Sequence, residues 1–238
     1  MELTQQTRHT QQTRPASRTG TSLRGAGIAG LAAAVLLFGG QGFILAKGAA
    51  EPAFGASAAE IQRFYETHDT IFFSIGSYLM VLGLIAFLWF ICGVHTAVRG
   101  HGSQREWLPT VALASGVAAV GATLLDAWQL AVFRVSEGLD TDLARFAFDM
   151  GNLAFASAWV ALGSFAIAAG WAGLSSRSLP GWLGWWAVAA GIGLVAARAV
   201  WTSPAWLFPY ALFWIWVIVV SVRFLAGRWS SQPLPPEG

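Results

Sequence analysis

The chain has 238 residues, of which 55% are hydrophobic and only 11% are charged. An ordinary soluble domain carries about 25% charged residues, so this composition excludes a water-soluble surface over most of the chain. The pI near 9.1 comes with 14 basic residues, but four of them are arginines in the first 24 residues, where they favour a membrane orientation over nucleic-acid binding.

The charges are clustered, and the uncharged runs between them are long. A run of about 18 or more apolar residues is typical of a membrane-spanning helix. The sequence therefore predicts an all-α, polytopic membrane protein, in which residues 25–226 form a bundle of six transmembrane helices. In chain order, the predicted helices are 25–46, 70–94, 107–133, 150–174, 180–201 and 205–222.

The two ends of the chain are polar. Residues 1–24 are rich in Thr, Gln, Ser and Arg, which predicts a disordered basic cytoplasmic tail, and residues 227–238 are predicted to be a short cytoplasmic tail. The first helix is longer than the apolar region of a signal peptide, so we expect it to be retained. Small residues at Ala46, Ala49 and Ala50 leave cleavage open as the alternative.

Two helix starts are predicted outside the bilayer. Ser57 followed by Glu60 is typical of a capping box, and an apolar face through Ile61, Phe64 and Tyr65 predicts a short amphipathic helix. A cap at Asp140 or Thr141 predicts two helical turns ahead of the helix 150–174.

Basic residues predict the orientation. With the amino terminus inside, nine Lys and Arg residues lie on the cytoplasmic side and five on the other. Because cytoplasmic loops are enriched in Lys and Arg, both termini are predicted to be cytoplasmic. The Ala, Gly and Arg content suggests a GC-rich bacterial genome, so we expect the bacterial cytoplasmic membrane. Most tryptophans fall near the predicted boundaries, but Trp159, Trp214 and Trp216 lie in mid-span.

Small residues at four-residue spacing predict close helix packing, because they let backbones approach each other in lipid. An Ala-rich composition alone would also produce such pairs. The spaced sets are Ala112/Gly116, Ala166/Gly170 and Ala189/Gly193/Ala197.

Ionisable residues within membrane helices are costly, so Asp126 and Arg198 are the first candidates for a functional site. They lie 17 and 18 residues after Pro109 and Pro180 and reach a similar depth. We predict that they are neighbours, as an ion pair between two helices or as part of a ligand or proton site. Further polar candidates on the same side are His68, Asp69, Gln129, Asp149 and Asn152.

Together these seven residues predict a polar vestibule on the extracytoplasmic side. One helical face carries Asp142, Arg145, Asp149 and Asn152, and the alternative is that this face is only a solvated helix entrance.

Several kinds of site are excluded or unexpected. Cys92 is the only cysteine, which excludes an intrachain disulfide and a CxxC motif, and with them a quinone-coupled thiol oxidoreductase. None of the four histidines has the spacing of a zinc motif, and no Gly-rich phosphate loop is present. We therefore expect no metal and no cofactor.

Three stretches carry a family resemblance: SAAEIQRFYETH (57–68), SLPGWLGWWAVAAGIGL (178–194) and LFWIWVIVVSVRFL (212–225). With them the chain resembles, over residues 55–228, an uncharacterised family of small six-helix bacterial integral membrane proteins, a domain of unknown function. The resemblance implies the six-helix topology. The family has no established activity, so the resemblance implies no site residues.

No recognisable catalytic set is present, so the leading prediction is a non-enzymatic membrane protein of unknown role. Its expected partners are membrane lipids and an apolar or amphipathic small molecule, with no nucleic acid and no prediction of oligomeric state. One alternative is a lipid or isoprenoid transferase or cyclase that uses Asp126, Asp149 or His68 as an acid or base. The second is a small-molecule transporter or efflux component, which requires a polar path past mid-depth.

Overall fold

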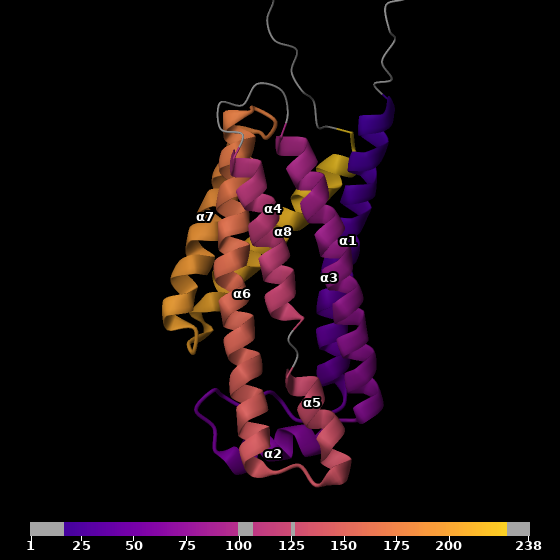
Figure 1. Cartoon of the computed structure of the whole chain (residues 1–238), viewed down its shortest axis with the longest axis vertical. Helices are drawn as coiled ribbons and strands as arrows, with labels where there is room; N and C mark the ends of the chain where they lie inside the picture. Colours follow the sequence, from indigo (N-terminus) through magenta and orange to yellow (C-terminus); the bar gives the residue numbers. More distant parts are fainter. Residues whose placement is uncertain (1–16, 100–106, 125–126, 228–238) are drawn as a thin grey trace, which may run out of the picture.

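The computed structural model describes residues 17–99, 107–124 and 127–227, and the side chains from Ser22 onward. Every element in these ranges is a helix, and the elements follow one another through short connections (Figure 1). In chain order they are α1 (Ser17–Ala46), α2 (Ala58–Thr67), α3 (Thr70–Val98), α4 (Trp107–Thr123), α5 (Ala127–Arg134), η1 (Val135–Glu137), α6 (Thr141–Ser175), α7 (Gly181–Ala197), η2 (Arg198–Val200), η3 (Pro204–Trp206) and α8 (Leu207–Leu225).

Six segments of the described chain are long and apolar enough to cross a membrane. The predicted all-α chain with six such segments is therefore confirmed. The stretch 107–133, predicted as one helix, holds α4 and α5, and the two residues just before α5 lie outside the described residues. The helix predicted at 150–174 is the later part of α6. Most of the two predicted tails lies outside the described residues, but residues 17–24, which were predicted to belong to a disordered tail, are helical and form the start of α1.

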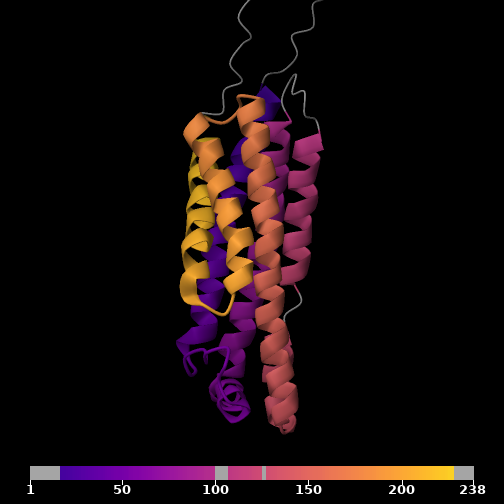
Figure 2. The same ribbon diagram turned by 90° about the vertical axis from the view of Figure 1, so that its left-hand side faces the viewer.

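The bundle has two different ends. The terminal end holds Ser17, Val98 and Leu225, and the opposite end, here the α2 end, holds α2, η1 and the start of α6 (Figure 1). At about 1.5 Å per residue, the 35 residues of α6 span about 52 Å, whereas a hydrocarbon layer is about 30 Å thick. Figure 2 shows the consequence: α6 extends well beyond the turn that joins α7 to α8.

Side-chain caps fix where the helices at the α2 end begin. Ser57 Oγ accepts a hydrogen bond from the backbone N–H of Glu60. The Asp140 carboxylate accepts hydrogen bonds from the backbone N–H groups of Asp142 and Leu143, in the first turn of α6. These caps confirm the predicted helix starts at these two positions. The amphipathic α2 then buries its apolar face of Ile61, Phe64 and Tyr65.

The buried side chains form two cores. The larger, the bundle core, lies among the membrane-length helices and includes Phe87, Phe165 and Trp216. The smaller, the α2 core, joins α2 to α3, α5 and α6 through residues such as Phe64 and Phe148. The α2 end is therefore a small packed cap on the bundle, and not a set of loose loops.

Helix backbones touch at glycines. A Cβ atom added to Gly40 would lie 2.6 Å from the Gly76 carbonyl oxygen, and one added to Gly163 would lie 2.6 Å from that of Gly191. Such contacts hold α1 against α3 and α6 against α7. The predicted packing pairs Ala112/Gly116 and Ala166/Gly170 are buried, as expected, whereas Ala189 is exposed, so the prediction for that position was wrong. The exposed side of α7 at Ala189 faces away from the bundle.

Candidate functional site

The seven predicted vestibule residues do not form one pocket. His68 is buried at the end of α2, where its Nδ1 lies 2.5 Å from the Phe64 carbonyl oxygen and its Nε2 has no hydrogen-bond partner in the described chain. Asp69 caps α3 by accepting hydrogen bonds from the N–H groups of Ile71 and Phe72. Both residues thus serve the junction between α2 and α3.

Asp149 belongs to a polar link across the α2 end. Its Oδ2 accepts a hydrogen bond of 3.0 Å from Arg145 Nε, one turn earlier on α6. Arg145 Nη1 also donates to the backbone carbonyl of Ala56, at 2.9 Å. This side chain therefore fastens the segment 47–57, which joins α1 to α2, to the side of α6.

The other candidates are dispersed. Gln129 lies half-buried on α5, and the Arg198 guanidinium lies 5.7 Å from the ring centroid of Trp201. Asp126 lies outside the described residues, so its predicted contact with Arg198 stays a prediction. Asn152 is the one candidate that the described cavity lining includes.

The cavity that Asn152 lines is large and mostly apolar. It has a volume of about 460 Å³ and lies among α1, α3, α4, α6 and α8. Its lining residues on α3 run from Phe73 to Phe87, a rise of about 21 Å. Eleven aromatic side chains contribute to it: Phe38, Phe54, Phe73, Phe87, Trp128, Phe155, Trp159, Trp201, Trp206, Tyr210 and Trp214.

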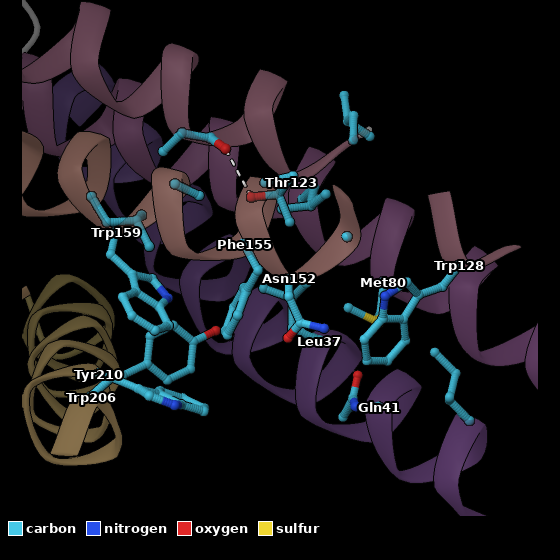
Figure 3. Close-up of a pocket in the computed structure, with 18 of the residues that line it drawn as sticks. Leu37, Gln41, Met80, Thr123, Trp128, Asn152, Phe155, Trp159, Trp206 and Tyr210 are labelled. Atoms are coloured by element: carbon cyan, nitrogen blue, oxygen red, sulfur yellow. Dashed lines mark hydrogen bonds between the residues drawn. The ribbon is translucent and has the colours of Figure 1, made fainter. Parts of the chain in front are cut away.

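One wall of the cavity is an aromatic cluster of Phe155, Trp159, Trp206 and Tyr210, which gather on one side in Figure 3. Trp159 and Trp206 stack with centroids 5.1 Å apart, and Trp206 and Tyr210 meet at 5.7 Å. Phe155 lies edge-on to all three. Because each ring is fixed by its neighbours, this wall is a preformed surface for flat or apolar groups.

Packed rings close the cavity toward the terminal end. We call them the aromatic plug: Phe87, Phe90, Phe165, Phe213 and Trp216, each at most 2% exposed. Phe87 lies 6.1 Å from both Phe165 and Phe213, centroid to centroid, and Trp216 lies 6.1 Å from Phe165. The cavity is therefore confined to the half of the bundle nearer the α2 end.

Within the membrane-length segments, exposed side chains line the cavity at two places. Phe38 and Leu207 line it and stay exposed between α1 and α8, and Val81 and Leu124 do so between α3 and α4. These positions lie within membrane-length segments, so both openings face the region that lipid would occupy.

The segment 47–57 covers the cavity at the α2 end. Glu51, Pro52 and Phe54 line the cavity from this segment, and the Phe54 ring packs edge-on against Trp201, with centroids 4.3 Å apart. Part of Glu51 stays exposed, while the surrounding protein desolvates its carboxylate and raises its pKa above the ordinary value. Glu51 therefore sits at a mouth of the cavity.

A few polar groups interrupt the apolar lining. Thr123 Oγ1 donates to the Ala119 carbonyl, and Asn152 Nδ2 donates to that of Phe148 (Figure 3 shows the first bond). The Asn152 Oδ1 and the Gln41 amide form no hydrogen bond with the rest of the described chain. Both amides are thus available to orient a polar group of a ligand.

The polar side chains of the described residues do not form a metal centre. Nowhere in the described ranges do three His, Cys, Asp or Glu side chains gather closely enough to hold a metal ion.

Sequence reasoning missed most of the cavity, although one signal pointed to it. The sequence predicted that Trp159 and Trp214 lie in mid-span, away from the headgroup boundaries that indole prefers. Both line the cavity. Glu51 gave no such signal, because an acid between two membrane helices is ordinary in an exposed loop.

Comparison with known proteins adds no further identification. No family model matches the sequence, no curated protein matches it, and no solved structure matches it. The family that the three motif stretches suggest stays a prediction.

Proposed function

We propose that this protein is a non-enzymatic membrane protein that binds an apolar or amphipathic small molecule in its aromatic cavity. The observation that carries the proposal is an apolar cavity of about 460 Å³ with openings between membrane-length helices. Ligand pockets typically have volumes of about 300–1,000 Å³, with apolar and aromatic walls and a few polar groups. A molecule dissolved in the lipid could enter through either opening without crossing water.

The proposal includes an orientation. Both termini lie in the cytoplasm of a bacterial cell, and the cavity faces the extracytoplasmic side. The excess of nine basic residues over five supports this orientation. The ligand would then exchange with the outer leaflet or with the space beyond it.

The orientation is tested by labelling. We expect Ser136→Cys, at the α2 end, to react in whole cells with a maleimide that cannot cross membranes, because η1 would be extracytoplasmic. Ser175→Cys, at the terminal end, should react only after the membrane is opened. Both serines are exposed, and both variants carry Cys92→Ser to remove the native thiol. The reverse labelling pattern would refute the proposed orientation.

Ligand binding is tested by filling the cavity. Ala154 lines it, whereas Ser157, on the same helix, is exposed and does not. We expect Ala154→Phe to weaken binding of the neutral fluorescent lipophile N-phenyl-1-naphthylamine at least about tenfold, because the new ring occupies the space of the ligand. Ser157→Phe adds the same ring outside the cavity and should leave the dissociation constant unchanged.

The binding is measured by titrating the full-length protein in dodecyl maltoside micelles and following probe fluorescence. Thermal midpoints of both variants show whether they are folded. Equal binding by wild type and a folded Ala154→Phe variant would contradict the proposal.

The two alternative functions have weaker support. The transferase or cyclase alternative relies on Asp126, Asp149 or His68 as its acid or base. Neither His68 nor Asp149 lines the cavity, and Asp126 lies outside the described residues. Passage of a solute would require a route through the aromatic plug, where the rings of Phe87, Phe165 and Phe213 contact one another. Ligand binding requires neither that His68 or Asp149 move into the cavity nor that the aromatic plug open.

A further inference from the structure

We infer that the ligand of this cavity is an amphipathic organic cation, with its ammonium or phosphonium centre near Glu51 and its apolar groups against the aromatic walls. The inference rests on the proposed function and specifies the chemical class of the ligand. Its first support is charge: Glu51 is the only Asp, Glu, Lys, Arg or His among the described residues that line the cavity.

The negative charge of Glu51 has no internal counter-ion within the described ranges. Its carboxylate forms no ion pair or hydrogen bond there, since the two ion pairs join Arg134 to Glu137 and Arg145 to Asp149. A partly desolvated carboxylate without a partner is costly, and an entering cation lowers that cost. An entering anion would meet the same carboxylate with repulsion.

Aromatic faces give the second support. The face of an aromatic ring attracts cations, most strongly for tryptophan, and a cage of such rings is the common protein site for quaternary ammonium groups. The cavity mouth near Glu51 has Phe54 and Trp201 in contact, and Trp206 follows on η3. The fold already uses this attraction at two places: Lys47 Nζ lies 4.7 Å from the Phe72 ring centroid, and the Arg198 guanidinium lies 5.7 Å from that of Trp201.

The openings give the third support. A ligand that enters between α1 and α8 or between α3 and α4 comes from within the membrane, so it must be soluble there. Lipophilic cations meet this requirement because their charge is covered by apolar groups. The acceptor atom Asn152 Oδ1 can also take a hydrogen bond from a protonated amine.

The test compares two probes of nearly the same shape and opposite charge, tetraphenylphosphonium and tetraphenylborate. Equilibrium dialysis of the full-length protein in dodecyl maltoside micelles gives the affinity for each. We expect wild type to bind tetraphenylphosphonium at least about tenfold more tightly than tetraphenylborate, once the amount of each probe that partitions into the micelles has been subtracted. Glu51→Gln should weaken binding of that cation about tenfold and leave or improve binding of the anion.

Two controls make the result specific. Glu60→Gln removes the same charge from an exposed site on α2 outside the cavity lining, and it should bind both probes like wild type. The neutral lipophile N-phenyl-1-naphthylamine should bind wild type, Glu51→Gln and Glu60→Gln equally, which also shows that the variants are folded.

The outcomes separate the inference from the proposed function. If the neutral probe binds but Glu51→Gln binds tetraphenylphosphonium like wild type, the cation inference is wrong and the binding function stands. If none of the three probes binds wild type, the proposed function fails and the inference fails with it.

A competition experiment identifies the source of the cation. Phosphatidylethanolamine carries an ammonium group, and diacylglycerol carries similar chains without a headgroup. Displacement of tetraphenylphosphonium by the first lipid alone would assign the site to a lipid headgroup. Displacement by neither would assign it to a free lipophilic cation, and equal displacement by both would contradict charge recognition.

Discussion

Replacing Gly40 with leucine is expected to prevent stable folding, whereas the same replacement at the neighbouring Gly39 is expected to be tolerated. A Cβ atom at Gly40 would lie 2.6 Å from the Gly76 carbonyl oxygen and 3.1 Å from the Met80 backbone nitrogen. Backbone atoms cannot rotate away as a side chain can, so α1 and α3 would have to separate. Overpacking of a core typically costs about 1–3 kcal/mol, and we expect at least the upper value here.

Gly39 is a matched control, because it differs from Gly40 by one position on the same helix. Nothing lies within 4 Å of a Cβ atom at Gly39, and the position is exposed. The measurement is the yield of monodisperse protein and its thermal midpoint in micelles. We expect almost no monodisperse Gly40→Leu protein and a Gly39→Leu midpoint close to that of wild type. Similar midpoints for the two variants would show that this helix contact does not hold the bundle together.

The six membrane-length segments could be predicted because lipid imposes a strict requirement. Hydrocarbon offers no hydrogen-bond partners to the backbone, so a crossing segment must be a helix of sufficient length and apolar character. That requirement is visible in the sequence, residue by residue. The contact of Gly40 with Gly76 was not predicted, because it depends on how two helices rotate against each other.

The polar vestibule was predicted from polar residues that share one side of the membrane, but position along a helix does not determine what a side chain contacts. Asp69 is used by its own helix as a cap, and Asp149 is paired with Arg145. These local partners hold Asp69 Oδ1 and Asp149 Oδ2 apart from a common pocket, although Asp149 Oδ1 is buried without a hydrogen-bond partner in the described chain. Asn152 alone projects into the cavity, because it lies where α6 passes the aromatic cluster.

The cavity arises from the arrangement of whole helices. At the terminal end α8 lies against α1, where a Cβ atom on Gly27 would be 2.6 Å from the Ser221 carbonyl oxygen. Farther along, α8 crosses away from α1 toward α7 (Figure 1), and the aromatic residues fill only part of the space between them. No local sequence pattern specifies such a crossing. Trp159 and Trp214 indicated an unusual interior, without indicating its shape.

Replacing Trp216 with alanine is expected to be the most destabilising change in the aromatic plug, at a cost of about 3–5 kcal/mol. Trp216 has no exposed surface, and its ring centroid lies 6.1–6.4 Å from those of Phe90, Phe165 and Phe213. Its Nε1 donates a hydrogen bond of 3.1 Å to the Leu183 carbonyl, which joins α8 to α7. In lipid, helices associate through such packing and interhelical hydrogen bonds, so both contributions are lost together.

Trp89→Ala is the control, because Trp89 is 69% exposed on α3 and the same atoms are removed from a lipid-facing position. We expect a lower thermal midpoint for Trp216→Ala and a nearly unchanged one for Trp89→Ala. Trp216 does not line the cavity, so the folded fraction of Trp216→Ala should bind N-phenyl-1-naphthylamine with wild-type affinity. Loss of binding together with an unchanged midpoint would place the ligand in the plug itself, and the boundary drawn between cavity and plug would then be wrong.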